Sequence, residues 1–227
     1  MGELITFPSN GKTCSGYLAV PEKGSGPGLI VIQEWWGLVP HIKDAAESAG
    51  RRRLRCLGTR RVSRSGNHRT GRGRQAQMAL ALETTARDMS AAVDHLAGLS
   101  MTVGKGIGVI GFCMGGGLAL WLSTLNSKVT ACVPFYGAIP WPNFQPDYAD
   151  SVAAYLGHYA EHDGWATLDS ARHLERQLRQ LGREVEFHVY PHTEHAFFND
   201  ARPEVYNAEA SKLAWQRTLA FLRGRIG

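Results

Sequence analysis

"GIGVIGFCMGGGLALWL", residues 106–122, decides the fold of this chain. The part before Cys113 is apolar and contains β-branched residues, as in a strand that is buried on both faces. The part after Cys113 has the apolar periodicity of a helix. Cys113 is therefore predicted on a sharp strand-to-helix turn, which would expose its side chain above the sheet as a nucleophile. The alternative interpretation is a buried structural cysteine, which is common in proteins.

Glycines flank this cysteine in the positions that such a turn requires. Gly111 and Gly115 lie two residues before and after Cys113, where a Cβ atom would crowd the backbone. The predicted helix begins at the cysteine, so its unpaired N–H groups would face developing negative charge. The N–H of Met114 is the expected oxyanion donor, and removing one such donor typically costs about 10²–10³-fold in rate.

Strand and helix patterns alternate along the rest of the chain. Strands are predicted at 3–8, 14–21, 28–34, 106–112, 129–137, 152–159 and 184–191, the first two forming a hairpin. Helices are predicted at 41–49, 77–98, 114–126, 167–182 and 204–223. This alternation predicts a single α/β domain over 1–227, with a mostly parallel central sheet and helices on both faces.

Composition narrows the protein class. Hydrophobic residues make up 44% and charged residues 20% of the 227 residues, as in ordinary globular proteins. No apolar run is long enough to cross a membrane, and the N-terminus has no signal-peptide pattern. The four cysteines lack CxxC spacing, which argues against a zinc site and a disulfide framework. We expect a cytoplasmic protein without cofactor or metal, as a monomer or weak homodimer.

Residues 50–75 break the alternation. Residues 48–82 contain ten arginines and no Asp or Glu, and they account for the net charge of +5. The stretch is interpreted as an exposed insertion, as a nucleic-acid-binding arm, or as the product of a shifted reading frame. Nucleic acid is not expected as a partner, because the stretch lies inside an enzyme-like chain. Because an unpaired buried charge is costly, the sheet is expected to lack a strand at this place or to have the place poorly filled. Within the stretch, only residues 53–59 are apolar enough to form a strand.

A thiol nucleophile needs a base and a residue that orients the base. Asp163 follows the strand predicted at 152–159, and His195 follows the strand predicted at 184–191. Both are therefore expected at the carboxyl edge of the sheet, where sites gather in open α/β sheets. The rival positions are His162 and His192 for the base, and Asp150 and Asp169 for the acid. A metal held by His192 and His195 would lack a further ligand at suitable spacing.

The chain resembles the dienelactone hydrolase family of α/β-hydrolases. The resemblance is carried by "IVIQEWWGL" (30–38), "GVIGFCMGG" (108–116), "PFYG" (134–137), "GHYAEHDG" (157–164) and "YPHTEHAFFNDARPEVYNAEAS" (190–211). It spans about 1–49 and 76–227. It implies an α/β-hydrolase fold and a catalytic triad of Cys113, Asp163 and His195. It further implies that Glu34 interacts with the resting thiol and that the Trp35 N–H is the second oxyanion donor.

Two departures from this family bear on the substrate. The family holds a substrate carboxylate with arginines, and one of their positions is occupied here by Asn199, with Arg202 three residues later. Another arginine belongs to the region that residues 50–75 replace. Weaker substrate-binding candidates are Trp36, Tyr136, Phe197 and Arg202. The resemblance implies a cysteine hydrolase of a small-molecule lactone or ester; the alternatives are a broader esterase or thioesterase, and a non-catalytic binding protein with a basic arm.

Overall fold

The computed structural model describes residues 2–9, 11–32, 40–51, 55–59, 72–139 and 145–227. Within them the chain forms an eight-stranded sheet in the order β1-β2-β4-β3-β5-β6-β7-β8. The strands are β1 (Glu3–Ser9), β2 (Lys12–Ala19), β3 (Gly26–Ile32), β4 (Arg55–Thr59), β5 (Thr102–Phe112), β6 (Val129–Phe135), β7 (Ala154–His162) and β8 (Val185–Glu194). The neighbours from β4 to β8 pair in parallel, and β2 is antiparallel to both β1 and β4.

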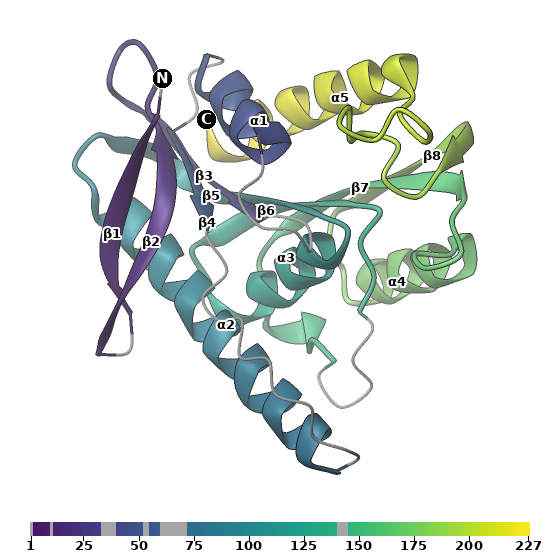
Figure 1. The fold of residues 1–227 in the computed structure, drawn as a ribbon, viewed down its shortest axis with the longest axis horizontal. Helices are drawn as coiled ribbons and strands as arrows, with labels where there is room; N and C mark the ends of the chain where they lie inside the picture. The colour runs from purple at the N-terminus through teal and green to yellow at the C-terminus, as the bar shows by residue number, and fades with distance from the viewer. Residues whose placement is uncertain (1, 10, 33–39, 52–54, 60–71, 140–144) are drawn as a thin grey trace.

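Helices cover both faces of this sheet (Figure 1). One face carries α1 (Pro40–Arg51) and α5 (Ala208–Ile226); the other carries α2 (Arg72–Gly98), α3 (Met114–Leu125) and α4 (Leu168–Gln180). The central strands are buried on both sides: Leu29 and Val31 of β3 face the core under α1 and α5, whereas Ile30 and Ile32 face the core under α2 and α3. The predicted α/β-hydrolase fold is therefore confirmed.

The expectation of a missing or poorly filled strand near residues 50–75 is wrong for residues 55–59. β4 pairs with β2 on one side and with β3 on the other. Without a strand here, both neighbours would have unpaired N–H and C=O groups inside the sheet. Ladder bonds come from the backbone, so tertiary context places a strand where the side-chain pattern is weak.

Several predicted boundaries also shift. α2 begins at Arg72, five residues before the predicted start, and its added residues include good helix formers such as Gln, Ala and Arg. α5 begins at Ala208 instead of at 204, because the side chain of Asn207 caps it by accepting a hydrogen bond from the Ala210 N–H at 3.0 Å. β7 and β8 each extend three residues beyond the predicted ends, to His162 and Glu194.

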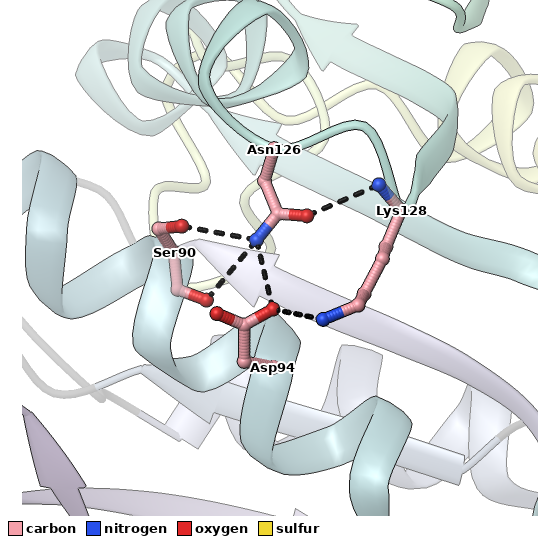
Figure 2. Close-up of polar contacts among 4 residues, drawn as sticks. All are labelled: Ser90, Asp94, Asn126 and Lys128. Atoms are coloured by element: carbon pink, nitrogen blue, oxygen red, sulfur yellow. Dashed lines mark hydrogen bonds and ion pairs between the residues drawn. The ribbon is translucent and has the colours of Figure 1, made fainter.

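A polar cluster joins α2 to the turn between α3 and β6 (Figure 2). The Asn126 amide donates to Ser90 Oγ at 2.9 Å and to Asp94 Oδ1 at 3.2 Å. Its Oδ1 accepts from the Lys128 N–H at 3.1 Å, and the Lys128 ammonium lies 2.5 Å from Asp94 Oδ1. One amide therefore bonds to three residues from two segments of the chain and holds α2 against the loop that leads into β6.

Replacing Asn126 with Ala is expected to lower the free energy of unfolding by about 1–2 kcal/mol, because these half-buried polar groups lose a shared partner. The midpoint of urea unfolding should fall while the m-value stays unchanged. Gln180→Ala, at the exposed end of α4, is the control and should leave the midpoint within error. A midpoint for Asn126→Ala equal to that of the control would contradict the stabilising role of the cluster.

Candidate active site

Cys113 occupies the predicted turn between β5 and α3. Its φ of 54° and ψ of −121° are a conformation that L-residues rarely adopt, and its side chain makes no capping hydrogen bond to the helix. Its own N–H donates to Phe135 O at 3.0 Å, which fixes the turn against β6. A Cβ atom at Gly111 would lie 1.9 Å from Gly115 O, so the turn can form only with glycine at that position.

The start of α3 lies unusually close to the chain that follows β6. A Cβ atom at Gly116 would lie 2.7 Å from Gly137 Cα, and one at Gly117 would lie 2.1 Å from Ala138 O. These glycines let the helix approach the neighbouring strand end backbone to backbone. The N-terminus of α3, with the Met114 N–H in its first turn, is thereby held beside the thiol.

The three sequence-predicted residues form one hydrogen-bonded chain. His195 Nε2 lies 3.2 Å from Cys113 Sγ, and His195 Nδ1 lies 2.7 Å from Asp163 Oδ2. Asp163 Oδ1 accepts from the N–H groups of Trp165 and Ala166, each at 2.8 Å. The Asp163 side chain is fully buried, whereas 26% of the His195 side chain is exposed. The arrangement meets the geometric requirement for a thiol nucleophile, a base and an acid that orients the base.

The surroundings of Asp163 and His195 favour the charged forms of these two groups. Burial would raise the pKa of Asp163, but the hydrogen bond and charge of His195 and the two backbone N–H groups outweigh it and lower that pKa. Burial would likewise lower the pKa of His195, but the hydrogen bonds and charges of Asp163 and Cys113 raise it to about 9. His195 is therefore protonated at neutral pH and can serve as a proton donor.

Because the pKa of His195 rises from 6.5 to about 9 on folding, its contribution to stability is complete below pH 6.5 and disappears as pH rises through 9. In that window the native state keeps a proton that the unfolded chain has lost. We expect the free energy of unfolding to fall by about 1–3 kcal/mol over the window. Urea unfolding at several pH values measures it, and His195→Gln should lack this fall; equal slopes in both proteins would contradict the assignment.

Aromatic rings surround His195. The Tyr136 ring lies 5.0 Å from the imidazole and the Trp165 ring 5.4 Å from it, both edge-on. Tyr136 and Phe197, expected as substrate contacts, are fully buried, and Arg202 is exposed and paired with Glu204 at 2.8 Å. Their contact with substrate stays a prediction. The sequence reasoning missed Trp165, although its position two residues after the acid could have drawn attention to it.

Glu34, Trp35 and Trp36 lie outside the described residues, so their predicted roles stay predictions. His162 and His192 lie beside the Glu161 carboxylate, at 3.4 and 3.8 Å, and neither is the histidine that contacts Cys113. Asp150 lies in a short 3₁₀ turn and Asp169 in the first turn of α4.

Two further features of the described residues bear on other kinds of site: a buried thiol and the arrangement of metal-binding side chains. Cys132 is fully buried, and burial raises the pKa of its thiol. Among the described residues, no group of three His, Cys, Asp or Glu side chains could hold a metal ion. Within the same residues, no helix is long and apolar enough to cross a membrane.

A model of the dienelactone hydrolase family matches residues 14–225. The chain belongs to the dienelactone hydrolase family. Protein usf of Aquifex pyrophilus is 29% identical to it over 233 residues, covering 98% of both chains. A protein of Aquifex aeolicus that is named by inference as a carboxymethylenebutenolidase is 26% identical over 231 residues, again covering 98% of both.

A solved structure shares the fold of this dienelactone hydrolase family member. It is a dienelactone hydrolase-like promiscuous phosphotriesterase from metagenomic libraries, with a TM-score of 0.85 and 20% identity. The match covers 100% of this chain and 99% of the other. The family comparison confirms the resemblance read from the motifs and the class of carboxylic ester hydrolase.

Proposed function

We propose that the protein hydrolyses lactones or small esters through a covalent acyl-enzyme formed on Cys113. The observation that carries the proposal is the continuous hydrogen-bonded chain from the Cys113 sulfur through His195 to the buried Asp163 carboxylate. A thiol in contact with an imidazole can give its proton to that imidazole, and the thiolate formed in this way is the proposed nucleophile.

In the first half-reaction the thiolate attacks the carbonyl carbon, and the carbonyl oxygen becomes an oxyanion. The Met114 N–H and, as the family resemblance implies, the Trp35 N–H are the proposed donors to it. The C–O bond then breaks, and His195 gives its proton to the departing alkoxide. In the second half, neutral His195 takes a proton from water, which attacks the thioester and releases the acid and the thiolate.

The proposed substrate class follows from the residues that stand here at the positions where the family binds a substrate carboxylate. Asn199 stands where the family has a carboxylate-binding arginine; its side chain accepts from the Ala201 N–H at 3.0 Å. Arg202 is engaged with Glu204. We therefore expect neutral lactones and small esters to be hydrolysed at least as well as dienelactones that carry a carboxylate.

The test is a substrate panel of cis- and trans-dienelactone beside p-nitrophenyl acetate and a small acyl thioester. Turnover of at least one ester or lactone is expected. A preference for the thioester would favour the esterase or thioesterase alternative. Folded protein that turns over none of them would contradict the hydrolase proposal, and salt-dependent DNA binding would then favour the binding-protein alternative.

Thiol labelling gives a second prediction. Cys113 is partly exposed and contacts His195, whereas Cys14 and Cys132 are buried. Iodoacetamide should therefore modify Cys113 about tenfold faster than it modifies any of the other cysteines. Quantitative peptide mapping of all four cysteines measures this. Cys56 or either buried cysteine reacting as fast as Cys113 would count against an activated thiol at the turn.

A further inference from the structure

The pairing of β7 with β8 is irregular near the ends of the two strands, just before Asp163 and His195. Ala160 faces Tyr190, but the next recorded pair is His162 with Glu194. β7 therefore advances by two residues while β8 advances by four, which makes a two-residue bulge in β8. Such bulges occur next to active sites, where they redirect a side chain.

This bulge decides which residue of β8 lies opposite Asp163. If the pairing of Ala160 with Tyr190 continued without interruption, Asp163, three residues on, would face Thr193. The two extra residues bring His195 to this level instead, since His162 faces Glu194 and the next residues are Asp163 and His195. The bond of 2.7 Å between Asp163 and His195 therefore depends on the bulge.

Glu161, on β7, is bonded to the bulge. His192, within the bulge, has a φ of 55°, a left-handed conformation that is costly for a residue other than glycine. Its N–H donates to Glu161 Oε2 at 2.7 Å. A backbone N–H displaced from the ladder by a bulge needs a replacement acceptor, and the carboxylate supplies it.

The backbone N–H, not the imidazole of His192, is the group that Glu161 holds. The His192 side chain is 92% exposed and its Nδ1 lies 3.8 Å from the carboxylate, while His162 Nε2 lies at 3.4 Å. The hydrogen bond from the His192 N–H is the largest cause that lowers the pKa of Glu161.

We propose that Glu161 is a positioning residue for the triad: its carboxylate holds the β8 bulge in the conformation that brings His195 level with Asp163. The inference rests on the proposed function of the triad, but it concerns the geometry of the His195–Asp163 bond and can be tested without turnover. Within the described residues, Glu161 makes no hydrogen bond or ion pair with Cys113 or His195.

Two variants of Glu161 distinguish the effect of its side-chain length from the effect of its negative charge. Glu161→Gln loses the charge but keeps an oxygen at the same reach, whereas Glu161→Asp keeps the charge and is shorter by one methylene. We expect Glu161→Gln to keep kcat/KM for the best ester of the panel within about threefold. Glu161→Asp should lose about 10–100-fold, because a displacement near 1 Å transmitted from a remote residue can cost about 10²-fold. The same pair of changes at Glu186 of β8, whose carboxylate lies 2.7 Å from His188 Nε2, is the control and should be neutral.

The NMR resonance of the His195 Nδ1 proton, which is bonded to Asp163, reports the geometry of that bond directly. A residue that only stabilised the fold would leave this resonance unchanged. The resonance should persist in Glu161→Gln and shift or disappear in folded Glu161→Asp. His192→Asn keeps the N–H and tolerates the left-handed conformation, so it should resemble the wild type. The proposal is overturned if Glu161→Asp resembles the wild type, if Glu161→Gln loses the resonance, or if His192→Asn loses as much as Glu161→Asp. Absence of turnover in the wild type would contradict the proposed function alone, since the resonance still reports the bulge.

Discussion

Cys113→Ala is expected to reduce kcat for ester hydrolysis by about 10⁴–10⁶-fold, the loss that accompanies removal of a catalytic nucleophile. The reason is that the variant keeps the turn, the helix N-terminus and His195 but has no atom to form the acyl-enzyme. Steady-state kinetics on the best ester of the panel measures the effect, and mass spectrometry should find no acyl adduct on the variant.

Cys14→Ala is the matched control for the nucleophile variant. Cys14 is a buried thiol on β2, the antiparallel strand beside β4, and the change should leave kcat within about threefold while lowering stability slightly. Substantial activity in Cys113→Ala, with the control unchanged, would mean that another group attacks the carbonyl and that the acyl-enzyme proposal is wrong.

Asp163→Asn is the second change with a large expected effect. The carboxylate accepts from His195 Nδ1 at 2.7 Å and helps to raise the pKa of His195 to about 9. An amide in its place favours the wrong tautomer of the imidazole, and comparable substitutions cost about 10⁴-fold in kcat. We expect a loss of about 10³–10⁴-fold.

The pH profile distinguishes this loss from simple unfolding. In the wild type, kcat/KM should fall as pH rises through about 9, because His195 then no longer carries the proton that the leaving group needs. In Asp163→Asn the alkaline limb should move to lower pH. Asp169→Asn, in the exposed first turn of α4, is the control and should leave the limb in place; an unmoved limb in Asp163→Asn would contradict the proposed coupling.

The three residues of the proposed triad could be located from sequence because each follows a strand with a strong local signal. Gly111, Cys113 and Gly115 define the turn on their own, and Asp163 and His195 each follow an apolar strand. In a parallel sheet such positions converge at one edge. His162 and His192 share that edge, and the resemblance to the family is what selected Asp163 and His195. Their meeting in one hydrogen-bonded chain follows the geometry that this reasoning predicted.

Features that depend on contacts between distant segments could not be predicted in the same way. β4 is a strand because β2 and β3 present unpaired backbone on either side of it. Its sequence made residues 53–59 a possible strand, but the arginines around it favoured an exposed stretch without one. Glu161 is bonded to His192, 31 residues away, through a bulge that strand periodicity does not reveal. Trp165 reads as a loop residue, and its packing on His195 depends on how β7 and β8 end.

The position of β4 also sets the order in which the sheet can assemble. β1 and β2 are adjacent in sequence and can pair as soon as both are synthesised, but their place in the sheet is beside β4, which ends at residue 59. β3 is made before both of its neighbours, β4 and β5, and the second of these ends only at residue 112. Such non-local pairing slows folding, because loops must close before the contacts form. On the ribosome, the N-terminal hairpin must therefore wait for a short strand from the arginine-rich stretch before it joins the sheet.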